Sequence, residues 1–384
     1  MSELKSSYLW QTSEKIIGFN TVSSESNLNC AEYISNHLQD FGFNVHLTQE
    51  PGAKAQIVAW IGPPEKNGLI LSGHMDVVPF ADQPGWTKDA LKLTLETEKL
   101  YGRGTTDMKL FITQCLEAFK STDLKKLKKP IVCLFTCDEE VGCLGAKNLS
   151  PHLKSILGEM PLPDKALIGE PTEFKIFNAH KGVVIFEVIL KGSGGHSSRP
   201  DLGKNAILMA EKVLLTVNQL NALYQNEVQD THKKLFPDFP YNYISVAQID
   251  GGLAANMIPE ECRIILSYRA LPGEPAHRLL NEFRNIVSKQ GLEEIEIHEK
   301  TTVPPLSPKK NIELEKSLQA LTQNRIEATN FATDASYFSQ EDIACFICGG
   351  GTLSMAHQPD EFMTLNDFLK GPQFIKELLQ QTVF

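Results

Sequence analysis

The feature that most constrains this chain is an apolar run that ends directly in acidic residues. The run IVCLFTC follows Pro130 and leads at once into Asp138, Glu139 and Glu140. A stretch without polar alternation is typical of a strand buried on both faces, as strands are in parallel sheets. Carboxylates at the mouth of such a strand are costly unless something positive binds them. The run therefore predicts a layered α/β domain, and its acidic end is either a solvated surface pair or the partner of a bound cation.

Similar segments lie on both sides of this run. Strand-like patterns occupy residues 43–48, 55–61, 69–72, 166–170 and 343–347, and helical spacing of apolar residues occupies 1–19, 29–41, 110–119 and 311–325. Strands that alternate with helices predict an α/β domain with a mostly parallel sheet.

The middle of the chain has a different order of elements. It reads as a strand at 183–191, a helix at 205–224, strands at 244–250 and 263–269, a helix at 274–290 and a strand at 294–298. This order predicts a smaller α+β domain of the ferredoxin-like type with an antiparallel sheet, and the stretch TTVPPLSP after it is expected to be a linker. A chain of 384 residues is long enough for two domains. We expect one domain to comprise residues 1–180 and 300–384, interrupted by a second at 181–299.

Composition argues against several classes of function. The net charge is −10, and the one basic cluster, at 125–129, is more typical of a solvated loop or helix end than of a nucleic-acid site. No run of eighteen apolar residues is present, so no membrane span is expected. The N-terminal residues lack the basic start, apolar stretch and cleavage site of a signal peptide, so we expect a cytoplasmic protein.

The cysteines predict neither a disulfide scaffold nor a metal cluster. Eight cysteines in 384 residues are too sparse for a disulfide-rich fold. Cys345 and Cys348 form a C-x-x-C pair, but apolar residues surround them and a glycine run follows, which favours a buried strand ending in a turn. Side chains three positions apart on a strand point to opposite faces, which is poor geometry for chelation.

Five segments place histidine, aspartate or glutamate after apolar strands or in glycine-rich turns. They are SGHMD at 72–76, GRGTTDMK at 102–109, DEE at 138–140, GEPT at 169–172 and AHQPD at 356–360. In an open α/β sheet, ligands gather beyond the carboxyl ends of the strands. Each segment alone is more typical of a hydrogen-bonded loop or a solvated surface pair. Together they predict a metal site, and imidazole nitrogen with carboxylate oxygen suits zinc.

In their order along the chain, the five segments resemble the zinc aminoacylase and carboxypeptidase family, which includes acetylornithine deacetylases, succinyl-diaminopimelate desuccinylases and carboxypeptidase G2. The resemblance extends over nearly the whole chain and is carried by KLYGRGTTDMK, LKKPIVCLFTCDEE, IGEPTEFKIFNAHKG and GSGGHSSRP. AHQPDEF, with the TTVPPL stretch ahead of it, favours the acetylornithine deacetylase branch. Met75, Leu110 and Cys137 depart from the pattern without removing a ligand.

The resemblance implies a set of metal ligands. Asp107 would bridge two zinc ions in each subunit. His74 and Glu170 would complete one site, and Glu140 and His357 the other. Zinc lowers the pKa of a water and polarises the acyl carbonyl, and Co²⁺ is expected to substitute for it.

The resemblance also implies three catalytic residues. Glu139 would be the general base, which takes a proton from water and gives it to the leaving amine. Asp76 would orient the imidazole of His74 from behind. His196 would donate a hydrogen bond to the developing oxyanion, although a histidine of this kind can also simply order the loop before a helix.

The substrate-binding residues follow partly from chemistry and partly from the resemblance. The guanidinium fork of Arg269 suits a carboxylate, and Asn256 resembles a family position that contacts substrate. Gly349 and Gly350 lie in a glycine run whose N–H groups suit an anion. Asp334 would pair with a cationic side chain of the substrate or form an exposed helix cap.

The resemblance therefore implies a zinc-exopeptidase-like catalytic domain with an inserted lid and dimerisation domain. The implied reaction converts N2-acetyl-L-ornithine to L-ornithine and acetate in arginine biosynthesis. Desuccinylation and dipeptide or carboxypeptidase cleavage are the alternative reactions, and a non-catalytic zinc-stabilised binding protein is the alternative from another class. The resemblance further implies a homodimer in which His196 reaches the active site of the partner subunit.

Overall fold

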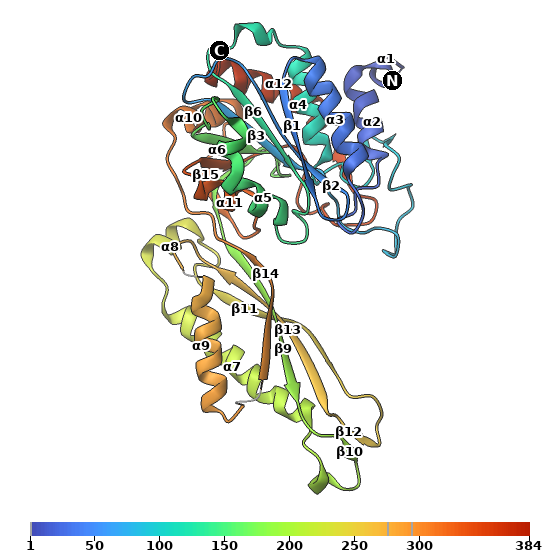
Figure 1. Cartoon of the computed structure of the whole chain (residues 1–384), viewed down its shortest axis with the longest axis vertical. Coiled ribbons are helices and arrows are strands. Elements are labelled where there is room, and N and C mark those ends of the chain that lie inside the picture. Colours follow the sequence, from blue (N-terminus) through green and yellow to red (C-terminus); the bar gives the residue numbers. More distant parts are fainter. Residues whose placement is uncertain (1, 275, 293–294) are drawn as a thin grey trace. The chain divides into compact units, whose positions relative to one another are not determined.

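The helices and strands of the computed structural model, which describes residues 2–274, 276–292 and 295–384, separate into two compact units (Figure 1). The first comprises Met1–Asn178, Pro308–Glu327 and Thr333–Phe384, and the second comprises Ala179–Ser307 and Ala328–Ala332. The short return of residues 328–332 to the second unit was not indicated by any sequence pattern. The predicted helix at 274–290 and strand at 294–298 each include a residue, 275 and 294, that lies outside the described part of the chain.

The first unit is built on an eight-stranded sheet in the order β1-β2-β6-β3-β7-β16-β8-β15. Its strands are β1 (Asn44–Glu50), β2 (Lys54–Ile61), β3 (Leu69–His74), β6 (Ile131–Thr136), β7 (Lys165–Ile168), β8 (Ile176–His180), β15 (Ile326–Thr329) and β16 (Ala344–Ile347). The four central strands β6, β3, β7 and β16 are mutually parallel. Every residue in them is buried, which explains why their sequences are largely apolar.

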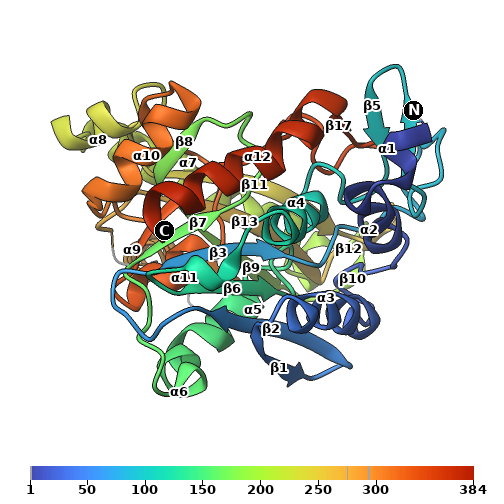
Figure 2. The ribbon, with the colours of Figure 1, turned by 90° about the horizontal axis from the view of Figure 1, so that it is seen from above.

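Helices cover both faces of this sheet. The helices are α1 (Ser2–Ser6), α2 (Tyr8–Ile17), α3 (Leu28–Asp40), α4 (Lys109–Lys120), α5 (Leu144–Leu149), α6 (Leu153–Leu157), α10 (Ile312–Thr322), α11 (Ala335–Gln340) and α12 (Leu365–Thr382), with short 3-10 helices at Leu124–Lys126 and Ser150–His152. Side chains of α3, α4, α10 and α12 share one apolar core with alternate residues of the strands. Helices α5 and α6 lie on the other side of the sheet from α4 and α12 (Figure 2).

A small antiparallel sheet joins two distant segments of the first unit. It has the order β17-β5-β4, with β4 at Thr94–Glu96, β5 at Lys99–Tyr101 and β17 at Phe362–Thr364. Phe362 pairs with Tyr101. This pairing holds the segment after His357 beside the loop that leads into α4.

The second unit contains a four-stranded antiparallel sheet in the order β11-β13-β9-β14. Its elements are β9 (Gly182–Lys191), β10 (Gly195–His196), a 3-10 helix at Pro200–Leu202, α7 (Ala206–Asn226), α8 (Asp230–Leu235), β11 (Tyr243–Gly251), β12 (Met257–Ile258), β13 (Glu261–Ala270), α9 (Ala276–Lys289) and β14 (Ile295–Val303). Residues of α7 and α9 form one core with alternate residues of β9 and β13. The predicted fold, an α/β domain with a mostly parallel central sheet and a ferredoxin-like α+β insertion, is confirmed.

Several local predictions need correction. Residues 2–17 form two helices where one was predicted, because Ser7 separates them and its side chain caps the second through the N–H of Trp10. Thr301–Val303 extend β14 rather than begin a linker. Cys345 lies within β16 and Cys348 directly follows it, and both are buried free thiols, as predicted. Among the described residues, none of the helices combines the length and apolar character needed to cross a membrane.

Candidate metal centre

The carboxyl ends of three parallel strands bring the predicted ligands together. His74 is the last residue of β3, Glu139 and Glu140 follow β6, and Glu170 follows β7. Strand β3 lies between β6 and β7, so its two neighbours place acidic loops on either side of the histidine. Asp107 reaches the same edge from the loop before α4.

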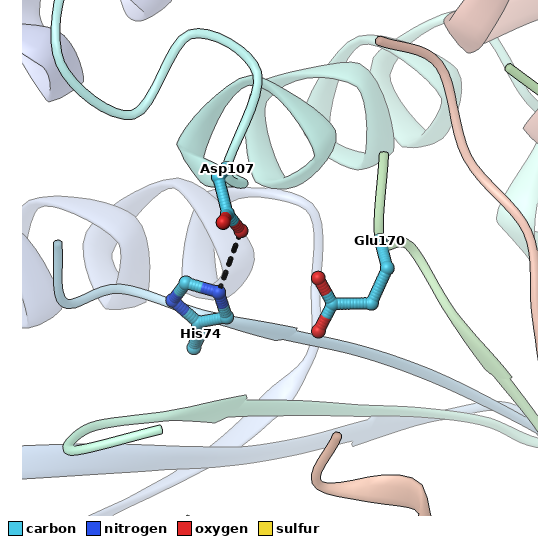
Figure 3. A group of neighbouring side chains, drawn as sticks. All are labelled: His74, Asp107 and Glu170. Atoms are coloured by element: carbon cyan, nitrogen blue, oxygen red, sulfur yellow. Dashed lines mark hydrogen bonds and ion pairs between the residues drawn. The ribbon is translucent and has the colours of Figure 1, made fainter. Parts of the chain in front are cut away.

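The first candidate group consists of His74, Asp107 and Glu170, whose side chains converge in Figure 3. One ligand atom from each lies within 4.8 Å of the others, and all three residues are buried. Nε2 of His74 is 3.1 Å from Oδ1 of Asp107. The set of one imidazole and two carboxylates matches the donors that zinc accepts.

The second candidate group consists of Asp107, Glu140 and His357. Nε2 of His357 lies 2.9 Å from Oε2 of Glu140 and 3.3 Å from Oδ2 of Asp107. The two carboxylate oxygens of Asp107 therefore face different groups: Oδ1 faces the first and Oδ2 the second. The side chain of His357 is 52% exposed, so this group opens toward solvent while the first is buried.

The electrostatics of these residues fit a bound cation. Burial raises the pKa of Glu170 well above its ordinary value, and burial together with nearby Asp107 raises the pKa of Glu140. Hydrogen bonds to Asp107 and Glu140 raise the pKa of His357 to about 10. Among the described residues, Oε1 of Glu140 is buried without a hydrogen-bond partner. Buried carboxylates that lack a partner are stabilised by a metal ion, so the donor set fits the predicted cofactor.

Asp76 contacts both the imidazole of His74 and the acidic loop after β6. Nδ1 of His74 donates to the main-chain carbonyl oxygen of Asp76 at 2.9 Å, whereas the carboxylate is 3.7 Å away. That carboxylate instead accepts the N–H groups of Glu139 and Glu140 at 3.1 and 3.2 Å, and the hydroxyl of Ser23. Asp76 therefore contacts the imidazole through its main-chain carbonyl, and its carboxylate fixes the acidic loop.

Glu139 lies in a third cluster, with Cys143 and Asp334. Sγ of Cys143 donates to Oε1 of Glu139 at 3.5 Å. Asp334 is 2% exposed and accepts the hydroxyl of Thr136 at 2.6 Å, and burial raises its pKa to about 6. The expectation of an exposed helix cap is wrong, because Asp334 precedes α11 without a side-chain cap bond and lies in the core beside Glu139.

The glycine run after β16 serves the packing of the site. A Cβ at Gly349 would lie 2.5 Å from the carbonyl oxygen of Gly169 and 2.7 Å from that of Glu170. The N–H of Gly349 donates to the hydroxyl of Thr172. The predicted use of the Gly349 N–H for a substrate carboxylate is therefore corrected, because that donor already has a partner. Gly350 follows it in the same turn.

The other predicted substrate residues lie in the second unit. His196 is exposed on β10, with Nδ1 2.7 Å from the hydroxyl of Ser198. Strand β10 pairs with β12, and the carbonyl of Asn256 accepts the N–H of Ser197, so His196 and Asn256 belong to one surface. Arg269 is partly buried near the end of β13, and burial lowers its pKa.

Sequence reasoning did not single out two buried residues that support Asp107. Arg103 and Glu361 form an ion pair with Nη1 and Oε2 2.7 Å apart. Both lie inside the recognised stretches GRGTTDMK and AHQPDEF. The available signal for Glu361 was that it directly follows Asp360 in AHQPDEF, so two acidic residues stand together close to the predicted ligand His357.

Comparison with known proteins identifies the family to which this chain belongs. Residues 70–381 match the family described as Peptidase family M20/M25/M40. An acetylornithine deacetylase of Buchnera aphidicola is 34% identical over 349 residues, which cover 90% of this chain and 88% of that protein.

Two solved structures share the fold. An M20 family metallo-carboxypeptidase of Sulfolobus solfataricus superposes with a TM-score of 0.80 at 18% identity, covering 98% of this chain and 99% of that one. The YXEP protein of Bacillus subtilis, described as a dinuclear metal binding peptidase, gives 0.66 at 13% identity, with 96% of each chain covered.

Proposed function

Because this chain belongs to peptidase family M20/M25/M40 and is a metal-dependent amidohydrolase, we propose that it hydrolyses N2-acetyl-L-ornithine to L-ornithine and acetate with two zinc ions per chain. The observation that carries the proposal is Asp107, which belongs to both candidate ligand groups. Such an enzyme would act in arginine biosynthesis in the cytoplasm.

The proposal gives each zinc ion its own set of ligands. His74, Asp107 and Glu170 would hold one ion, and Asp107, Glu140 and His357 the other. When bound, zinc supplies Lewis acidity that acidifies a water and polarises the acyl carbonyl, and Co²⁺ accepts similar ligands.

Glu139 would act as the general base. It is not part of either group that contains Asp107, so its carboxylate remains available to accept a proton. Its backbone is fixed by Asp76 and its side chain contacts Cys143. A carboxylate held in this way can take a proton from water and pass it to the leaving amine.

The substrate is proposed from the similarity to acetylornithine deacetylase over most of the chain. Arg269 and Gly350 would bind the substrate carboxylate, Asn256 would contact the substrate, and His196 would donate to the oxyanion. Asp334, predicted to pair with a cationic group of the substrate, lies buried beside Glu139 and accepts the hydroxyl of Thr136. Desuccinylation and dipeptide cleavage remain the alternative reactions of the same centre.

A homodimer through the second unit is part of the proposal. Strand β11 is an edge strand, and seven of its residues in a row, from Ser245 to Gly251, are exposed. Neighbouring α7 exposes Ile207, Leu208, Leu215 and Leu223. An uncovered edge beside exposed apolar side chains favours pairing with a second copy. In this dimer His196 would serve the active site of the partner subunit.

A substrate panel tests the reaction. Zinc-loaded protein is assayed with N2-acetyl-L-ornithine, N-succinyl-diaminopimelate and small dipeptides, and kcat/KM is compared. The proposal expects the highest kcat/KM for acetylornithine. A higher value for the succinylated substrate or for a dipeptide would assign the same metal centre to an alternative reaction.

A further inference from the structure

A buried ion pair lies between two loops that carry candidate metal ligands. Arg103 and Glu361 are 1% and 0% exposed, and their charged groups are 2.7 Å apart. Burying two charges is costly, and the pair is retained only where further hydrogen bonds satisfy its remaining atoms. The partners of those further bonds indicate what the pair is for.

Glu361 fixes the loop that ends in Asp107. Its Oε1 accepts three main-chain N–H groups, those of Gly104 at 3.1 Å, Thr106 at 2.8 Å and Asp107 at 3.1 Å. A single carboxylate oxygen that binds three amides of one turn determines the path of that turn. The backbone of Asp107, the residue shared by both ligand groups, is therefore held by Glu361.

Arg103 extends the network to the other loop. Its Nη2 donates to Oε1 of Gln83 at 2.6 Å, and Nε2 of Gln83 donates to the carbonyl oxygen of His357 at 2.7 Å. The indole N–H of Trp86 also donates to Oε1 of Gln83, and the guanidinium lies 5.0 Å from the centre of that ring. These contacts orient Gln83, so a chain of bonds leads from Glu361 to the main chain of His357.

The fold explains why these residues meet. Strand β17 pairs with β5, and the N–H of Gly102 donates to the carbonyl of Glu361 at 3.0 Å. The pairing brings together segments more than 250 residues apart. His357 is half exposed, so packing around its side chain does little to fix it, and a bond to its main chain matters correspondingly more.

We propose that Arg103, Glu361 and Gln83 form a positioning network that sets the spacing of the two candidate metal groups. Glu361 places Asp107 and so acts on both groups, whereas Gln83 places His357 and so acts on the second group alone. The inference rests on the proposed two-zinc function. Residues behind metal ligands commonly change metal affinity by about 10–100-fold when they are replaced.

Zinc affinity tests the network directly. Metal-free wild type, Gln83→Ala and Glu361→Gln are equilibrated with a graded series of zinc buffers, and bound zinc per chain is measured. We expect Gln83→Ala to bind one zinc with wild-type affinity and the other about 10–100-fold more weakly. We expect Glu361→Gln to weaken both, because the neutral amide cannot face Arg103 and the three N–H groups equally well.

An ion pair away from the metal centre, between a fully buried lysine and a glutamate that is 40% exposed, provides a control for a general loss of stability. Nζ of Lys165, which is also 0% exposed, lies 2.7 Å from Oε2 of Glu313 at the amino end of β7, away from the ligand edge. Glu313→Gln should lower the melting temperature while both zinc affinities stay at the wild-type value. Gln83→Ala removes a partly exposed side chain and keeps the test valid if Glu361→Gln folds poorly.

Three outcomes are distinct. Selective weakening of one zinc in Gln83→Ala supports the network. Wild-type affinity for both zinc ions in Gln83→Ala and in folded Glu361→Gln overturns it while leaving the proposed function intact. A wild-type chain that binds no zinc contradicts the proposed function itself.

Discussion

At the scale of single residues, replacing Glu139 tests whether catalysis can be separated from metal binding. Glu139→Ala should lower kcat by about 10²–10⁴-fold, the usual contribution of a general base. Both zinc ions should remain, because Glu139 lies outside the two groups that contain Asp107. Acetate release and bound zinc are measured on the same sample.

Glu32→Ala, an exposed substitution on α3, provides the control and should keep both activity and zinc. If Glu139→Ala instead lost zinc in step with activity, Glu139 would be a ligand and the proposed division of labour would be incorrect.

Arg269 tests the assignment of the substrate carboxylate. Arg269→Ala should weaken the binding of acetylornithine by about 1.5–3 kcal/mol, the value of a charged hydrogen bond, and should raise KM accordingly. Arg263→Ala is the matched control, because Arg263 lies on the same strand and pairs with Glu261. An unchanged KM in Arg269→Ala would show that other residues hold the carboxylate.

At the scale of elements, the contact between α4 and α12 depends on one glycine. A Cβ at Gly371 would lie 2.1 Å from the Cδ atom of Gln114, whose amide donates to the carbonyls of Asp367 and Phe368. Gly371→Ala should therefore lower the free energy of unfolding by about 1–3 kcal/mol, as overpacking of a core does.

A double-mutant cycle isolates that contact. Gln114→Ala removes the side chain that Gly371→Ala would strike, so the double variant should be more stable than the sum of the two single effects predicts. Denaturant unfolding measures all four proteins. Strictly additive effects would show that Gly371 is not constrained by Gln114.

Helix α12 also illustrates which elements could not be predicted from the sequence. The central strands were predictable because they are buried on both faces and so are largely apolar. Helix α12 was not predicted; its interior contains Gly371 and Pro372, a pair that is typical of a turn. Strands of three residues such as β5 and β17 carry too short a pattern to recognise.

The candidate site divides in a similar way. The residues of the two metal groups lie in the five segments that residue type singled out, and the family resemblance implied which of them are ligands. The burial of Asp334 and the pairing of Arg103 with Glu361 were not predicted, because they arise from contacts between segments about 200 residues or more apart. Local sequence spacing carries no record of such contacts.

At the scale of the whole molecule, the proposed dimer predicts that two inactive variants restore activity when they are combined in one dimer. Glu139→Ala and His196→Ala should each be nearly inactive as homodimers. If His196 acts on the partner's site, a mixed dimer of the two variants has one site with both defects and one with neither. Activity should then return to about half of the wild-type value, since general-base and oxyanion contributions are each large.

Verified heterodimers, separated by two different affinity tags, are required for this measurement. If each histidine serves its own chain, every site in the mixed dimer carries one defect and no activity returns. That result would place His196 in the active site of its own subunit, and the zinc chemistry would be unaffected. A chain that stays monomeric at all concentrations would contradict the dimer as well.

The central claim is that zinc held by this chain hydrolyses acetylornithine, and a zinc titration tests it most directly. Metal is removed with a chelator, zinc is added back stepwise, and acetate released from N2-acetyl-L-ornithine is measured alongside zinc bound per chain. We predict no turnover without metal and recovery as the two sites fill, because the nucleophile requires a metal to form at neutral pH. Full acetate release by metal-free protein, or none by the chain with two zinc ions bound, would contradict the account.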